Sequence, residues 1–202
     1  MTTTILIILV TCVVSFLALQ NRKLMDDLVL WPPAINRSRE YYRLISYGLV
    51  HADFGHLLFN MLTLYFFGRA IEEFYTSIMG PLGFVTFYIG GLLFSILPTY
   101  VKNRKNAGYT SLGASGAVSG VLFAFALFAP WRRILVIIVP MPVILYAILF
   151  VVYSIYMDRR GGDNVNHGAH LWGAAYGVIF TIALRPEILP YFLSAVTQPG
   201  LS

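Results

Sequence analysis

Long apolar stretches separated by short charged segments run through the whole chain. When every Asp, Glu, Lys and Arg is marked, six charge-free stretches remain, at 1–21, 54–68, 74–101, 106–131, 134–157 and 164–184. A helix rises 1.5 Å per residue, so about 20 apolar residues cross the hydrocarbon core of a bilayer. Five stretches have this length, and 54–68 attains it by continuing to residue 78 if Arg69, Glu72 and Glu73 lie near the headgroups. The pattern predicts six transmembrane helices, at about 3–20, 54–77, 80–101, 113–130, 133–156 and 165–184.

The segment 21–53 is the longest polar part of the chain. It combines Trp31 and Tyr41 with prolines and Arg43, a mixture that suits the headgroup layer. We therefore expect an interfacial first loop with short amphipathic helices. The tail after Arg185 is interrupted by three prolines and should be peripheral. A cleaved signal peptide is the alternative for 1–21, but no basic region precedes this stretch.

The composition excludes several other classes of protein. The 202 residues are 58% hydrophobic and 11% charged, whereas soluble domains are about 25% charged and disordered chains are poor in apolar residues. The single cysteine, Cys12, excludes an intramolecular disulfide. The net charge of +5 arises from short connecting segments and not from one basic face, so we expect no nucleic-acid partner. We predict a single all-α membrane domain over 1–202, a bundle of six transmembrane helices.

Polar residues inside the predicted spans are candidates for function, because a polar group in hydrocarbon needs a partner. His56 and Asn60 are four residues apart and share one face of their helix. Hydrogen bonds to a neighbouring helix are an alternative explanation for this pair.

A second cluster surrounds Ser115, within Gly113-Ala-Ser115-Gly116. Ser115 follows the polar segment 102–109, so it should lie near the start of a helix, where free N–H groups can stabilise a negative charge. Gly116 and Gly120 have the spacing of small residues that let helices approach closely, and packing alone is the alternative.

A third cluster contains His170, Gly173 and Gly177, whose offsets of three and seven place them on one helical face. A histidine beside a glycine groove can approach a neighbouring helix. If that helix carries Ser115, His170 can act as its general base. A histidine that merely hydrogen-bonds between helices is the alternative.

Together the clusters supply a nucleophile, a base and two side chains that can donate to an oxyanion, as acyl transfer requires. At this point the chain resembles the rhomboid family of intramembrane serine proteases, from about residue 41 to residue 177. The matching segments follow the family order: Tyr42-Arg43 (Trp-Arg in the family), His56-x-x-x-Asn60, Gly68-Arg-Ala-Ile-Glu72, Gly113-Ala-Ser115-Gly116 and Ala169-His170-x-x-Gly173-x-x-x-Gly177.

The resemblance implies a role for each matched residue. Ser115 would be the nucleophile and His170 its general base and acid. His56 and Asn60 would donate to the oxyanion together with the Ser115 backbone N–H, and Glu72 would tie the first loop or neighbouring helix ends together. The other matched residues would support the site: Arg43, Gly113, Gly116, Gly173 and Gly177. No metal or other cofactor is implied.

The acids of the chain are consistent with a Ser-His dyad. No Asp or Glu occurs in 164–184, and Asp163 lies seven residues before His170. The resemblance therefore implies a serine endopeptidase of the bacterial inner membrane that cleaves transmembrane segments of membrane-protein substrates. Residues 157–165 would form a cap over the site, and the helix 134–156 would admit substrate laterally.

Two features depart from the family. Many bacterial members have an aromatic residue, whose ring supports the histidine, at the position of Ser119. In addition, the cytoplasmic N-terminus usual in bacterial members would leave ten of the 14 basic residues outside, against the positive-inside rule. We follow the family orientation.

Three alternatives differ in the class of function. A metal or haem protein could use the four histidines, His51, His56, His167 and His170, although no carboxylate or thiol accompanies them as a ligand motif. A catalytically inactive rhomboid-like protein would bind membrane clients, but such proteins characteristically lose the serine or histidine retained here. A transporter would require intramembrane charge pairs or interrupted helices, which the pattern does not show.

Overall fold

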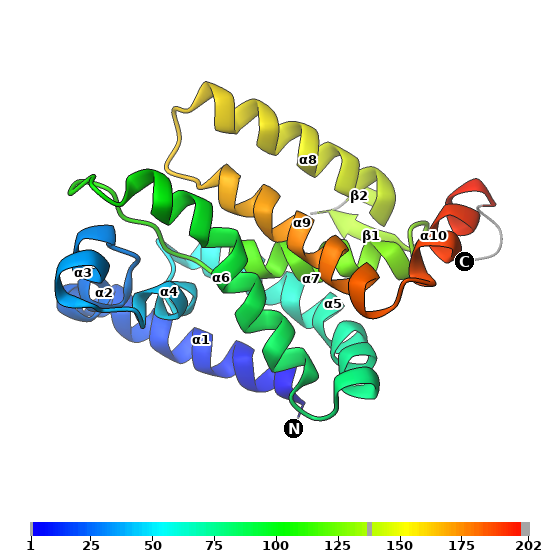
Figure 1. The fold of residues 1–202 in the computed structure, drawn as a ribbon, viewed down its shortest axis with the longest axis horizontal. Coiled ribbons are helices and arrows are strands. Elements are labelled where there is room, and N and C mark those ends of the chain that lie inside the picture. The colour runs from blue at the N-terminus through cyan, green and yellow to red at the C-terminus, as the bar shows by residue number, and fades with distance from the viewer. Residues whose placement is uncertain (1, 137–138, 199–202) are drawn as a thin grey trace.

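Helices make up most of the computed structural model, which describes residues 2–136 and 139–198 (Figure 1). Each long helix overlaps one of the charge-free stretches, and α5 and α8 extend into charged residues: α1 (Thr3–Gln20), α5 (Phe54–Met79), α6 (Gly83–Asn103), α7 (Ser115–Phe128), α8 (Val143–Arg160) and α9 (His167–Leu184). Shorter elements occupy the connections and the tail: α2 (Arg22–Leu28), α3 (Pro32–Ser38), α4 (Arg43–Ser46), the 3-10 helix η1 (Tyr47–Leu49), β1 (Arg133–Val136), β2 (Val139–Pro142) and α10 (Ile188–Thr197). Within the described residues the fold is therefore all-α apart from one two-stranded hairpin.

Helix α7 is the central element of the bundle. It contacts α5, α6 and α9, and ten of its 14 residues are buried. Its closest approach is to α9, where a Cβ added at Gly173 would overlap the Gly116 carbonyl oxygen and one added at Gly177 would overlap that of Gly120. Only residues without a side chain allow this contact between backbones. These four glycines therefore set the position of α9 relative to α7.

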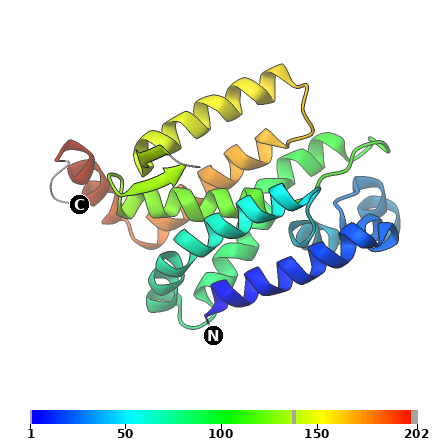
Figure 2. The same cartoon turned by 180° about the vertical axis from the view of Figure 1, so that it is seen from behind.

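Helices α1 and α8 lie on opposite flanks of the bundle, with the other long helices between them in both views (Figures 1 and 2). Helix α1 packs against α5, whereas α8 contacts mainly α9. In α8 only Val143, Ala147 and Ser154 are buried. The bundle therefore covers α8 on a narrow face only.

The segment before α8 contradicts the predicted helix over 133–156. Arg133–Val136 and Val139–Pro142 pair as antiparallel strands, and α8 begins only at Val143. Pro140 and Pro142 explain the late start, because proline lacks an amide donor and disfavours helical geometry in the residue before it. The absence of charge identified this stretch as apolar but could not separate strand from helix.

The tail after Arg185 forms α10, which is inclined at 116° to α9. Pro190 is in the first turn of α10, where a missing amide donor leaves no helical bond unmade. The Trp131 indole N–H donates to the Ala195 carbonyl and the Tyr191 hydroxyl donates to the Phe128 carbonyl, each at 3.0 Å. These bonds attach α10 to the end of α7; Pro199, the last proline of the tail, lies outside the described residues.

Two helices of the described chain, α1 and α6, are long and apolar enough to cross a membrane, and α9 with α10 would add a third if the bent pair is one span. Helix α7 is apolar but has only 14 residues. Polar and charged side chains lower the hydropathy of the other two, namely His56, Asn60 and Arg69 in α5 and Asp158 to Arg160 in α8. Six membrane crossings therefore stay a prediction.

Candidate active site

Ser115 and His170 meet at one end of the bundle. Ser115 is the first residue of α7, and His170 lies in the first turn of α9. The Ser115 Oγ and His170 Nε2 atoms are 2.7 Å apart, and both side chains are half-buried. The close approach of α7 and α9 at their glycines brings the two side chains within hydrogen-bond distance. A hydroxyl that donates to an imidazole nitrogen is the arrangement in which the imidazole can remove its proton.

The start of α9 is held by Asn166, a residue that the sequence motifs did not single out. Its Oδ1 accepts the Ala169 N–H at 3.0 Å, which caps the helix. Its Nδ2 lies 3.2 to 3.3 Å from hydroxyl oxygens of Thr99, Tyr109 and Ser111. Asn166 therefore connects the helix that carries His170 to the segment that leads into Ser115. An Asn directly before an apolar helix was the available signal.

His56 and Asn60 approach the same end of α7 from α5. The His56 ring lies against Gly113, where an added Cβ would come within 2.6 Å of His56 Cε1. Gly113 also has a φ of +107°, which only glycine adopts without strain. Asn60 is buried, and its Nδ2 donates to the His56 carbonyl at 2.9 Å. Among the described residues no hydrogen bond joins either side chain to Ser115.

The His170 ring has aromatic neighbours and no carboxylate partner among the described residues. The Phe150 ring of α8 lies 5.8 Å from it, centroid to centroid, and the His167 ring meets it edge-on at 5.6 Å. Ser119 does not take part, because its hydroxyl donates to the Ser115 carbonyl at 2.7 Å. The ring beside His170 thus comes from α8 and not from position 119 of α7, a contact that no short-range motif indicates.

Asp163 pairs with His167 and not with His170. Its Oδ2 lies 3.0 Å from His167 Nε2, and this hydrogen bond holds the pKa of Asp163 below its ordinary value. His167 is buried and its ring also meets the Tyr153 ring of α8 at 5.6 Å. The connection between α8 and α9, which contains Asp163, is therefore attached to the first turn of α9.

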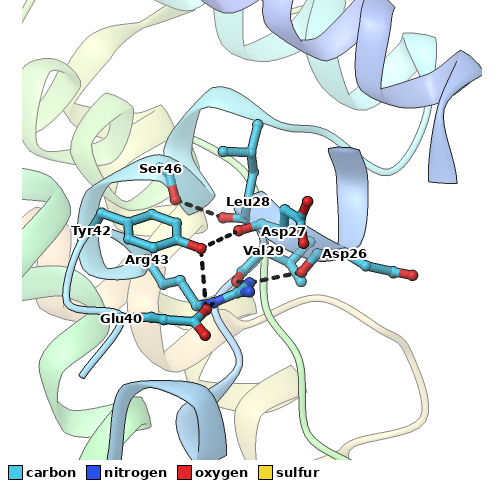
Figure 3. Close-up of polar contacts among 8 residues, drawn as sticks. All are labelled: Asp26, Asp27, Leu28, Val29, Glu40, Tyr42, Arg43 and Ser46. Carbon is cyan, nitrogen blue, oxygen red and sulfur yellow. Dashed lines mark hydrogen bonds and ion pairs between the residues drawn. The ribbon is translucent and has the colours of Figure 1, made fainter. Parts of the chain in front are cut away.

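The first loop is fixed by Arg43, whose guanidinium is buried (Figure 3). Its Nε donates to Glu40 Oε2 at 2.6 Å, and its Nη1 donates to the carbonyls of Asp26 and Val29 at 2.7 and 2.9 Å. A rigid guanidinium can serve several acceptors at once, which a single ammonium cannot match in geometry. Arg43 thereby ties α4 to the end of α2.

Tyr42 and Ser46 add to the same cluster (Figure 3). The Tyr42 hydroxyl lies 3.1 Å from the Asp27 carbonyl oxygen, and the Ser46 hydroxyl donates to the Leu28 carbonyl at 2.8 Å. Leu30, which directly follows Val29, joins this cluster to the chain before Ser115. Leu30 and Ser111 exchange two backbone hydrogen bonds, at 2.9 and 3.1 Å. The first loop therefore supports the segment that carries the serine.

Glu72 lies at the far end of α5 and joins it to the start of α1. Its two carboxylate oxygens accept the backbone N–H groups of Thr3 and Thr4, at 2.6 and 2.9 Å. These amides belong to the first turn of a helix and have no partner within it. Glu72 therefore holds neighbouring helix ends together and takes no part in the Ser115 site. Within the described residues no cluster of three or more His, Cys, Asp or Glu side chains could hold a metal ion.

Comparison with known proteins decides the family. The sequence model of the Rhomboid domain family matches residues 38–187, about three quarters of the chain. The chain belongs to the rhomboid family. Membership confirms the resemblance in the motifs, and together with the apolar helices it makes the chain an integral membrane protein.

Curated rhomboid relatives occur in a bacterium and in mitochondria. YdcA of Bacillus subtilis, named as a candidate rhomboid protease, is 28% identical over 161 residues, which are 77% of this chain and 76% of YdcA. The mitochondrial rhomboid-like protein 12 of Arabidopsis thaliana is 28% identical over 74% of this chain and 48% of its own. Rhomboid protein 1 of Saccharomyces cerevisiae mitochondria is 30% identical over 68% and 40%. The chain thus spans less than half of each of these two mitochondrial relatives. Because relatives occur in organelles as well as in a bacterium, a bacterial inner membrane stays a prediction for this chain.

Proposed function

We propose that this rhomboid is an intramembrane serine endopeptidase that cleaves transmembrane segments of membrane proteins with a Ser115–His170 dyad. The observation that carries the proposal is the 2.7 Å contact between Ser115 Oγ and His170 Nε2. It joins the two residues that match the family's nucleophile and base motifs. The contact lies at the helix ends, where α7 and α9 begin, and water would have to reach the half-buried serine from this side.

The dyad would work by proton transfer to and from His170. As Ser115 Oγ attacks the scissile carbonyl carbon, its proton passes to His170 Nε2 and a tetrahedral intermediate forms. The imidazolium then gives this proton to the leaving amine, and the C–N bond breaks to leave an acyl ester on Ser115. Water, activated by His170, hydrolyses the ester and restores both residues.

The negative oxygen of each intermediate would be stabilised by donors around the start of α7. The Ser115 backbone N–H is in the first turn of its helix, where amides lack helical partners and the helix dipole favours an anion. The Asn60 amide has two hydrogens, of which one goes to the His56 carbonyl. The second is available to the oxyanion, and the His56 ring beside Gly113 is a further donor.

Substrate would enter beside α8, because the bundle covers this helix on a narrow face only. The connection from α8 to α9 would act as a cap, with Gly161 and Gly162 both at positive φ and Asp163 fastened to His167. A transmembrane substrate must unwind before attack, since a helical peptide bond is shielded. We therefore expect helix-destabilising and small residues near the scissile bond. From the resemblance to the family we also expect six membrane crossings and a cytoplasmic N-terminus.

A catalytically inactive rhomboid-like protein is the second candidate, and a fluorophosphonate probe separates the two. We expect the purified wild type to be labelled at Ser115, identified by mass spectrometry of the modified peptide. Ser115→Ala should not be labelled, and His170→Ala should be labelled about 10² times more slowly, within the range for loss of a general base.

Ser154→Ala is the matched control for this labelling. Ser154 is buried and its hydroxyl has no hydrogen-bond partner among the described residues, so its rate should equal that of the wild type. A folded wild type that is never labelled would overturn the proposal in favour of the inactive protein.

A further inference from the structure

His51 lies in the loop before α5 and is completely buried. Both of its ring nitrogens have partners, and these belong to different parts of the fold. Nδ1 lies 2.9 Å from the Ser15 hydroxyl of α1, and Nε2 accepts the backbone N–H of Ala114 at 3.3 Å. A single side chain thus joins the outer helix α1 to the residue directly before Ser115.

The partners of His51 determine its protonation. The Ala114 N–H can only donate, so Nε2 carries no proton. The Ser15 hydroxyl donates its hydrogen to the Leu49 carbonyl at 2.8 Å, so Nδ1 must donate to the Ser15 oxygen. The ring is therefore neutral with its proton on Nδ1. Burial, reinforced by the neighbouring His56, lowers the pKa of His51 to about 3 and keeps it in this form.

The bond from Ala114 to His51 fixes the Gly113–Ala114 peptide, which directly precedes the peptide that carries the Ser115 N–H. The Ala114 carbonyl is fixed on its other side, because it accepts the Val118 N–H at 3.0 Å in the first turn of α7. The preceding residue is Gly113, whose freedom of rotation does not by itself orient Ala114. The His51 ring also meets the His56 ring edge-on at 4.9 Å. His51 thus contacts both sides of the region where the oxyanion would form.

We propose that His51, oriented by Ser15, is a positioning residue that aligns the Ser115 backbone N–H and the His56 ring for oxyanion binding. The inference rests on the proposed protease function and makes α1 a part of the catalytic architecture. It concerns a side chain that does not touch the reacting atoms, so its loss should lower kcat without weakening substrate binding.

The test compares variants of His51 in cleavage of a transmembrane substrate in proteoliposomes. His51→Leu removes the acceptor for Ala114 and keeps much of the volume. It should lower kcat by about ten-fold or more, less than the 10²–10³ for loss of a direct oxyanion donor, with KM within about two-fold. His51→Gln places an oxygen acceptor near the Nε2 position and should recover most of kcat. Ser15→Ala leaves the ring unanchored and should lower kcat by a few-fold.

The control is Thr11→Val, which removes another buried hydroxyl of α1, one that has no hydrogen-bond partner among the described residues. Its kcat should match that of the wild type. An active wild type with unchanged kcat in His51→Leu, or with equal losses in His51→Leu and His51→Gln, overturns the inference alone. A wild type that neither cleaves nor is labelled overturns the proposed function and the inference with it.

A second measurement does not depend on the folding of any variant. Nitrogen-15 spectra of histidine-labelled wild type should show one neutral ring protonated at Nδ1 and not at Nε2. Assignment of this signal to His51 supports the inference. A His51 ring that is protonated at Nε2, or charged at neutral pH, overturns it, because such a ring cannot accept the Ala114 N–H.

Discussion

Replacing Glu72 with Gln tests the link between α5 and α1. The carboxylate accepts two first-turn amides, from Thr3 and Thr4. Glutamine keeps one acceptor oxygen and turns its NH₂ group toward the other amide, so one charge-assisted hydrogen bond is lost. Such a bond contributes about 1.5–3 kcal/mol, and the charge at a helix N-terminus contributes about 0.3–1 kcal/mol more. Because Glu72 is only half-buried, we expect a loss of about 2 kcal/mol in the free energy of unfolding.

Thermal unfolding in detergent micelles measures this loss. For a domain of this size, 1 kcal/mol corresponds to about 2–4 °C in Tm, so Glu72→Gln should lower the Tm by about 4–8 °C. Glu73→Gln is the matched control, since Glu73 is adjacent and exposed and makes no hydrogen bond among the described residues. Its Tm should change by about 1 °C or less. Equal Tm values for the two variants would refute the assignment of Glu72 as the cap of α1.

Three further predictions concern stability. Arg43→Ala should lower the free energy of unfolding by about 3 kcal/mol, because the buried Val29 carbonyl and the partly buried Asp26 carbonyl lose a charged donor; an equal cost for the exposed Arg37→Ala would contradict this. Gly173→Val should abolish stable folding, since its side chain would overlap the Gly116 carbonyl; an unchanged Tm would show that α7 and α9 can separate freely. The Arg43 hydrogen bond lowers the pKa of Glu40, so this contribution to stability is present above the unfolded pKa and is lost as the pH falls below about 4. Glu40→Gln should flatten the dependence of Tm on pH there, and an unaltered slope would count against the ion pair.

The positions of the long helices follow from the chain's charge pattern, because charged residues concentrate at helix ends in a membrane protein. The pattern fails at 133–136 and 139–142, which form paired strands, the second with Pro140 and Pro142, before α8 begins, although both segments are apolar. It also says nothing of α10, whose attachment depends on Trp131 and Tyr191 meeting backbone carbonyls 64 and 63 residues away. Sequence periodicity indicates which residues share one face of a helix, but it does not indicate which element packs against that face.

The candidate site also contains residues that the sequence reveals and contacts that it does not. Ser115, His170, His56 and Asn60 are recognisable because each belongs to a short motif of small and polar residues. The contacts of His51 are not recognisable from the sequence, because Ser15 and Ala114 lie 36 and 63 residues away. The proposed role of His51 depends on its burial and on the partners of both ring nitrogens, and the sequence reveals neither.

Cleavage of a model transmembrane substrate tests the protease assignment most directly. The substrate should carry small, helix-destabilising residues near one end of its span, and the enzyme should be the full chain in proteoliposomes. We expect the wild type and the Ser154→Ala control to release a defined fragment, and Ser115→Ala to release none above background. Cleavage by Ser115→Ala at a rate comparable to the wild type, or no cleavage by the folded wild type, would contradict the assignment.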